Sequence, residues 1–232
     1  MSDYVANWYE KLPSDLKTHS KVDKHFKKHH ILPNSIIVCI GGTGSGKTNA
    51  LIDFLSRKDE AFYEIILFNP VSAQEPLYNM LKQKIPEMKI VTDVAELPDV
   101  KSFEDDRKHE KLIIFDDWIN LKPKELKKLN DFAISGRKAG FTSFYMSQSY
   151  TATPKIITRN ANYFIIFKLN DNHTINNILK NHNIHDIDKE HFKKMYHAST
   201  DEPRSFFMID LKGTGMSTHL RKNFLNFHKI DK

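Results

Sequence analysis

The sequence predicts an α/β protein whose mostly parallel central sheet is covered by helices on both faces. Short, uninterrupted apolar runs alternate along the chain with longer segments of helical spacing, which is the pattern of buried parallel strands joined by crossover helices. The chain has 232 residues, of which 40% are hydrophobic, so a single core of ordinary size is expected. These features exclude wholesale disorder.

The first expected strand, Ser35–Ile40, is a continuous apolar run, as in a strand covered on both faces. A glycine-rich segment follows it, and Asn49–Leu55 then shows helical spacing of apolar residues. Glu64–Phe68 is expected to be a second strand, because Asn69 and Pro70 after it favour a turn.

The remaining elements continue the alternation of strands and helices. Helical spacing recurs in two further segments, and apolar or β-branched residues mark four more strands. The further helices are expected at Glu75–Lys84 and Lys124–Ile134, and the further strands at Lys89–Thr92, Lys111–Phe115, Phe141–Met146 and Tyr163–Leu169.

The first thirty residues differ from the rest. Lysines and histidines crowd this stretch, and Val22 and Phe26 lie four apart, as in a basic helix with a narrow apolar edge. We therefore expect a basic N-terminal arm at 1–30 and one α/β domain at 31–232 that includes a C-terminal extension. The arm suits either a nucleic-acid or subunit contact or a solvated surface helix.

Charge and cysteine content narrow the class of protein. Lysine and arginine total 35 against 29 acidic residues, a net charge of +6, which favours polyanionic partners. An AT-rich genome would also produce a lysine-rich composition, and thus the same net charge, without any DNA-binding role. The single cysteine, Cys39, excludes an intrachain disulfide and is expected to pack as a small hydrophobe. No apolar stretch reaches membrane-spanning length, so a soluble, intracellular protein is expected.

The segment from Gly41 to Thr48 matches the phosphate-loop pattern G-x-x-x-x-G-K-[ST] in full. It lies between an expected strand and an expected helix, where loop and helix-terminal N–H groups can bind phosphates. Lys47 should reach the β- and γ-phosphates of ATP, and the Thr48 hydroxyl should bind Mg²⁺. A glycine-rich turn without a ligand is the alternative. The expected ATP-binding residues are Gly41, Gly42, Thr43, Gly44, Ser45, Gly46, Lys47, Thr48 and Asn49.

Two carboxylates, Asp116 and Asp117, directly follow the apolar strand Lys111–Phe115. In a parallel sheet the end of such a strand comes beside the phosphate loop. Asp116 is then expected to hold Mg²⁺ through its water shell, and Asp117 to orient or deprotonate the attacking water. The alternative is a surface turn, since Asp-Asp often begins one.

A later strand also ends in a polar residue, Gln148, after Phe141–Ser147. This order of elements suits ATPases in which an inserted strand separates the strand before the phosphate loop from the strand before the acids. Gln148 would then sense the γ-phosphate. A polar cap on a strand end is the other interpretation.

The segments GGTGSGKTN, LIIFDD, GRKAGFTSFYMSQSY and TPKIITRNANYFIIFKLND stand in this order between Ile31 and Leu179. In that order they resemble the FtsK–HerA superfamily of DNA-pumping ATPases, in particular the poxvirus-type genome-packaging ATPases of large DNA viruses and virophages. The phosphate loop is common to many families. Two other segments are more specific to the packaging ATPases. They are the Gly-Arg-x-x-Gly motif followed by a strand and Ser-Gln, and the Arg-Asn-Ala-Asn segment.

The resemblance implies a RecA-like P-loop NTPase core that assembles into a homo-oligomeric ring, a hexamer, around double-stranded DNA. ATP hydrolysis would drive translocation of a viral genome into a preformed capsid, and each site would be completed by an arginine of the neighbouring subunit. Arg137 and Arg159 match the family's arginine positions. Asp117 departs from the glutamate of many relatives, and Lys138 from a histidine. Capsid-vertex or membrane-associated viral proteins are implied partners, and the host cytoplasm (virus factory) or the virion is the implied location.

Other classes of function remain open on the sequence. A nucleoside or nucleotide kinase, or another P-loop phosphotransferase, uses the same loop, although its usual arginine-rich lid is not visible here. A non-catalytic nucleotide-gated scaffold would need no acid pair. A metal site among residues 182–191 is a weaker interpretation, because the stretch has the pattern of a polar helix and turn. The basic C-terminal run at 219–229 suits DNA contact or docking on the core equally.

Overall fold

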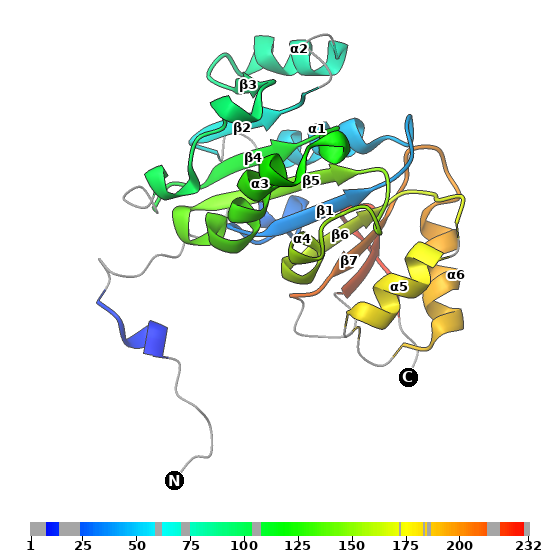
Figure 1. The fold of residues 1–232 in the computed structure, drawn as a ribbon. Coiled ribbons are helices and arrows are strands. Elements are labelled where there is room, and N and C mark those ends of the chain that lie inside the picture. Colours follow the sequence, from blue (N-terminus) through cyan, green and yellow to red (C-terminus); the bar gives the residue numbers. More distant parts are fainter. Residues whose placement is uncertain are drawn as a thin grey trace.

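The computed structural model describes residues 8–13, 24–58, 62–70, 75–103, 108–171, 173–182, 184, 187–212 and 219–229. Within them the strands form one sheet in the order β3-β2-β4-β5-β1-β6-β7-β8-β9 (Figure 1). Neighbouring strands pair in parallel from β3 to β6 and antiparallel from β6 to β9. The strands are β1 (Ile36–Ile40), β2 (Glu64–Phe68), β3 (Lys89–Val91), β4 (Lys111–Phe115), β5 (Phe141–Ser147), β6 (Tyr163–Ile166), β7 (Phe207–Asp210), β8 (Leu220–Lys222) and β9 (Asn226–Phe227).

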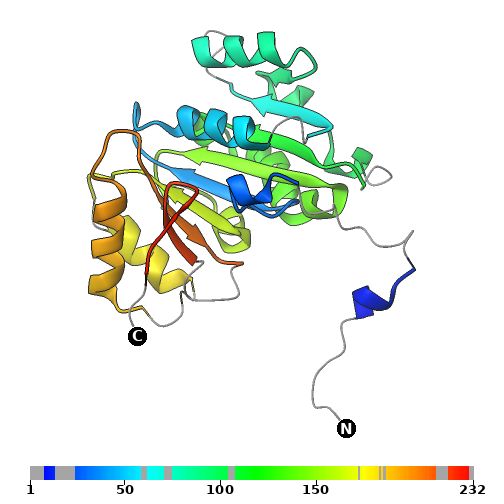
Figure 2. The same cartoon turned by 180° about the vertical axis from the view of Figure 1, so that it is seen from behind.

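Helices cover both faces of the sheet. Helices α1 and α2 pack on one face, seen in front in Figure 2, and α3 to α6 on the other, seen in front in Figure 1. The α-helices are α1 (Lys47–Lys58), α2 (Pro76–Lys84), α3 (Pro123–Ser135), α4 (Lys155–Asn160), α5 (His173–Asn181) and α6 (Lys189–Ser199). The 3-10 turns are η1 (Trp8–Lys11), η2 (Phe26–Lys28), η3 (Val94–Glu96), η4 (Val100–Phe103), η5 (Trp118–Asn120) and η6 (Gly136–Ala139).

The core has two layers because the central strands are buried on both faces. Val38 and Ile40 of β1 belong to the layer under α3 to α6, whereas Ile37 and Cys39 belong to the layer under α1 and α2. Cys39 is fully buried, and burial raises the pKa of its thiol far above the ordinary value. The expectation that Cys39 packs as a hydrophobe is confirmed.

The predicted α/β class is confirmed, as is the position of each expected strand up to β6. Strand β5 lies between β1 and β4, with Val38 and Phe115 both paired to Tyr145, so one inserted strand separates them as expected. The last predicted strand was too long, because pairing in β6 ends at Ile166 rather than at Leu169. Strands β7, β8 and β9 were not predicted from the sequence; in β8 the basic residues Arg221 and Lys222 hide the apolar pattern.

The two ends of the described domain meet on the α1 face. Arg221 of β8 is fully buried, pairs with Asp210 of β7 at 3.3 Å, and donates to the carbonyl oxygens of His29 and His30. Phe224 is also buried, so this part of the C-terminal run docks on the core. The helix expected in the N-terminal arm falls mostly outside the described residues; its described end forms η2.

Among the described residues no helix combines the length and the apolar character needed to cross a bilayer.

Candidate active site at the phosphate loop

The phosphate loop connects β1 directly to α1, as the sequence predicts. Gly44 and Gly46 have φ values of +73° and +112°, a backbone region that L side chains rarely adopt. A methyl group on Gly41 would come within 2.4 Å of Ser45 Oγ, whereas one on Gly42 would meet nothing within 4 Å. The loop therefore folds tightly on its inner side and leaves its outer backbone open to a ligand.

Lys47 is the first residue of α1 and is half-buried. Its ammonium group donates hydrogen bonds to the carbonyl oxygens of Gly41 at 2.8 Å and Gly42 at 3.0 Å. These two bonds hold the positive charge across the mouth of the loop. Together with the first amides of α1, the ammonium group makes this end of the helix attractive to an anion.

Asp116 follows β4 and is buried beside the loop, with 8% of its surface exposed. Its Oδ2 accepts a 2.6 Å hydrogen bond from the Tyr78 hydroxyl and a 3.4 Å bond from the Asn69 side-chain amide. Burial raises the pKa of this carboxyl group, Asp117 adds to the rise, and Tyr78 and Lys47 oppose it. The carboxylate is thus oriented by two neighbouring parts of the fold, the end of β2 and helix α2.

Asp117 is in the left-handed backbone region, with φ of +49°. Such a conformation is uncommon outside glycine, and aspartate is among the residues that tolerate it. The turn puts Asp117 and Trp118 into a small pocket that Lys47, Asp116 and Gln148 also line. The structure therefore brings together the loop lysine, both acids and the polar residue after β5, as the sequence reasoning expected.

Oxygen donors suited to Mg²⁺ are present at this pocket. The Tyr78 hydroxyl contacts the side chains of both Thr48 and Asp116, which places the two predicted Mg²⁺ ligands around one shared neighbour. Mg²⁺ prefers hydroxyl, carboxylate and water oxygens over nitrogen and sulfur ligands. Thr48 and Asp116 therefore fit the ion that the phosphate loop implies.

Arg137 and Arg159 do not join this pocket within the chain. Arg137 is exposed in η6, just before β5 begins, and Arg159 is exposed near the end of α4, which leads to the start of β6. The beginnings of these parallel strands lie at the edge of the sheet opposite to the phosphate loop. Arg159 lines a different cavity, together with Tyr150 and His182.

Tyr78 and Asn69 were not expected from the sequence to belong to the site. Asn69 follows β2, so the rule that polar residues at strand ends gather at one edge could have found it. Tyr78 carries no such signal, because on sequence it is one apolar position of an amphipathic helix. Its role depends on where α2 packs.

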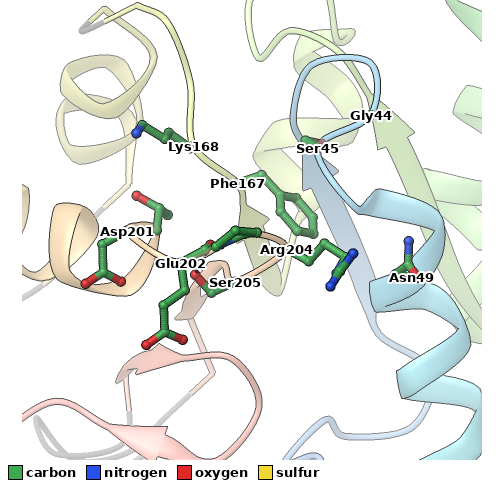
Figure 3. A pocket seen from close by; sticks show the side chains of 11 residues that line it. Gly44, Ser45, Asn49, Phe167, Lys168, Asp201, Glu202, Arg204 and Ser205 are labelled. Carbon is green, nitrogen blue, oxygen red and sulfur yellow. Dashed lines mark hydrogen bonds between the residues drawn. The ribbon is translucent and has the colours of Figure 1, made fainter.

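A second cavity, of about 500 Å³, opens on the other side of the loop (Figure 3). It is lined by Gly44, Ser45 and Asn49 on one side and by residues of the segment 200–205 on the other. The segment 200–205 connects α6 to β7 and drew no functional interpretation from the sequence.

The histidine and aspartate residues at 182–191 form no metal cage in the described part of this stretch, and His185 and Asp186 lie outside the described residues. Asp188 caps α6 by accepting from the amides of Glu190 and His191, and its carboxylate also bonds the His191 ring. These contacts account for Asp188 and His191 structurally.

Solved structures with the same fold include viral packaging proteins. B204, the DNA-packaging ATPase from Sulfolobus Turreted Icosahedral Virus, superposes with a TM-score of 0.57 at 17% identity, covering 82% of this chain and 97% of that one. B204 from Sulfolobus turreted icosahedral virus 2, in complex with ATP-gammaS, has a TM-score of 0.54 at 16% identity over 83% and 98%. EssC (ATPases 2 and 3) from Geobacillus thermodenitrificans has 0.53 at 11% identity over 86% and 41%. The RecA-like P-loop fold is confirmed by these likenesses.

No curated protein sequence gives a significant match. The model of the family described as Poxvirus A32 protein matches residues 23–210, which include the phosphate loop, both acids and the segment 200–205. The match covers most of the chain and confirms the resemblance drawn from its motifs. The chain belongs to the Poxvirus A32 protein family.

Proposed function

We propose that this chain is an ATP-hydrolysing motor that translocates double-stranded DNA and packages a viral genome into a preformed capsid. The observation that carries the proposal is the convergence of Lys47, Asp116, Asp117 and Gln148 on one pocket beside the phosphate loop. Membership of the family and the likeness to B204, a DNA-packaging ATPase, support the DNA substrate. The net charge of +6 agrees with a polyanionic partner.

Each residue has a distinct part in hydrolysis. The loop amides from Gly41 to Asn49 and the Lys47 ammonium group bind and neutralise the phosphates. Thr48 and Asp116 would hold Mg²⁺, which when bound would offset negative charge on the phosphates. Asp117 orients the attacking water and accepts its proton. Gln148 contacts the γ-phosphate and reports its loss to β5.

The positions of the two arginines suggest how a ring would complete the site. Arg137 and Arg159 are exposed and away from the pocket of their own chain, so in a homo-oligomeric ring either can face the site of a neighbour. An arginine supplied in this way contributes about 10³–10⁵ in rate. A hexameric ring around DNA, capsid-vertex or membrane-associated viral partners, and a location in the virus factory or the virion belong to the same proposal. The division into an arm at 1–30 and a domain at 31–232 stays a prediction.

The proposal is tested by hydrolysis assays with and without double-stranded DNA at low salt. We expect ATP hydrolysis that rises on addition of DNA, loss of turnover in Lys47→Ala, and nucleotide binding without hydrolysis in Asp117→Asn. ADP formation coupled to a phosphorylated nucleoside, with no effect of DNA, would instead indicate a kinase. Absence of both DNA binding and DNA-dependent hydrolysis would refute the motor.

The shared site is tested by mixing two inactive variants. Arg159→Ala keeps its own loop and acids, whereas Lys47→Ala keeps its arginines, so mixed rings should contain some complete sites and regain part of the activity. Arg137→Ala mixed with Lys47→Ala is the parallel experiment. If neither mixture regains hydrolysis while subunit exchange is verified by labelled subunits, the arginine does not act between subunits.

A further inference from the structure

The cavity beside the phosphate loop lies opposite to the acids. Along the sheet the order is β4, β5, β1, β6 and β7, so the acids after β4 lie on one side of the loop that follows β1. Strands β6 and β7 are antiparallel, with Ile166 paired to Phe207, so β7 begins where β6 ends. The residues that follow β6 and those that precede β7 therefore lie together, on the side of the loop away from the acids. A triphosphate whose γ-phosphate faces the acids, and whose other phosphates follow the loop away from them, would have its nucleoside end on the side of the cavity.

The inner wall of this cavity is formed by Phe167 and Arg204. A methyl group on Gly46 would come within 3.2 Å of both Phe167 Cε1 and Arg204 Cγ, so both side chains pack against the loop. In Figure 3 the Arg204 guanidinium group points across to Asn49 and the first turn of α1. It makes no hydrogen bond or ion pair with the residues that the structure describes. A planar cation with an open face is a stacking partner for an aromatic ring.

The segment that carries Arg204 is held in place by several contacts. Lys222 of β8 pairs with Asp201 at 3.0 Å and with Glu202 at 3.2 Å, which ties the segment to the sheet. Ser205 closes a turn by donating from its amide and its hydroxyl to the Glu202 carbonyl oxygen. Arg204 itself has φ of +65°, so its side chain leaves the turn in a direction set by the backbone.

We infer that this cavity binds the nucleoside part of the nucleoside triphosphate, with the Arg204 guanidinium group stacked on the base. The inference rests on the proposed function, which places the phosphates on the loop from Gly41 to Thr48. The volume of about 500 Å³ is within the range of small-molecule sites. A buried aromatic ring, a planar cation and a few polar groups such as Asn49 are the lining that such a ligand requires.

The inference is tested by calorimetric titration of the full chain with Mg²⁺ and either ADP or inorganic tripolyphosphate, which has phosphates but no nucleoside. Arg204→Asn removes the guanidinium group with a residue that tolerates positive φ, and Arg204→Lys keeps the charge but not the planar face. We expect both variants to bind ADP about 3- to 30-fold more weakly and tripolyphosphate with affinity changed less than about twofold. Lys124→Asn, a change of an exposed lysine on α3, is the matched control and should affect neither ligand.

Each other outcome overturns the inference. Equal losses for ADP and tripolyphosphate in Arg204→Asn, with affinity kept in Arg204→Lys, would assign Arg204 to the phosphates. Unchanged ADP affinity in both variants would exclude stacking on the base. Lys47→Ala tells a failure of this inference from a failure of the proposed function, because it should lower the affinity for both ADP and tripolyphosphate. If it lowers neither affinity, the phosphates do not bind at the loop.

Discussion

Tyr78 acts on the site through a single hydroxyl group. The residue is 2% exposed, so its ring belongs to the core under α1 and α2, while its oxygen lies 2.6 Å from Asp116 Oδ2 and also contacts Thr48. Burial beside Asp116 raises the pKa of this hydroxyl far above its ordinary value, so it stays a donor at any physiological pH. It therefore orients the carboxylate that is expected to hold Mg²⁺.

Tyr78→Phe should remove the hydrogen bond that orients Asp116 without changing the core. Groups that orient metal ligands are typically worth about 10- to 100-fold in metal affinity or activity. We expect the Mg²⁺ concentration for half-maximal ATP hydrolysis to rise about tenfold or more. Tyr145→Phe is the matched control, since its buried hydroxyl donates to the Leu129 carbonyl oxygen, at 2.8 Å, rather than to an acid. Equal Mg²⁺ requirements in the two variants would contradict this role.

At the scale of elements, the site is a set of chain segments that end at one edge of the sheet. Strand β5 pairs in parallel with β4 on one side and with β1 on the other. The loop after β1, the acids after β4 and Gln148 after β5 therefore lie side by side as a result of strand pairing alone. The loop itself is the most demanding segment, because it must turn sharply between β1 and α1.

Gly46→Ala should destabilise the nucleotide-free protein, because L side chains rarely adopt φ of +112° and an added methyl would crowd Arg204 and Phe167. Strain of this kind costs about 1–3 kcal/mol, which lowers Tm by about 2–10 °C in a chain of this size. Thermal unfolding without nucleotide measures it. Gly42→Ala, whose methyl would meet nothing within 4 Å, is the control. A Tm for Gly46→Ala equal to that of Gly42→Ala would show that the loop relaxes freely.

At the scale of the whole molecule, the C-terminal strands complete the fold rather than extend from it. Arg221 of β8 is fully buried and its charge is balanced by Asp210 of β7, which is 7% exposed. The same guanidinium group donates to backbone carbonyl oxygens at His29, His30 and Phe224. One side chain thus links β7, β8 and the segment that precedes β1, and the segment 200–205 is attached to this assembly through Lys222.

Arg221→Met should cost about 3–5 kcal/mol of unfolding free energy, because it removes the buried cation that balances the charge of the Asp210 carboxylate. Urea-induced unfolding measures the change. The double variant Asp210→Asn, Arg221→Met also removes the negative charge of the carboxylate and should recover part of the loss, giving a coupling of about 0.5–3 kcal/mol. A loss below about 1 kcal/mol in the single variant would mean that the ion pair is not what anchors β8.

The sequence by itself determined the α/β class, the first six strands and the positions of the phosphate loop and the two acids at strand ends, because periodicity and the phosphate-loop pattern are local properties. The packing of the elements against one another decided the rest. Asp116 and Tyr78 are 38 positions apart in the sequence, and Arg204, which packs against Gly46, follows α6. No local sequence pattern predicts either contact. On sequence, a basic residue such as Arg221 is expected at the surface. It is buried instead, because the tertiary structure places Asp210 beside it and so balances its charge.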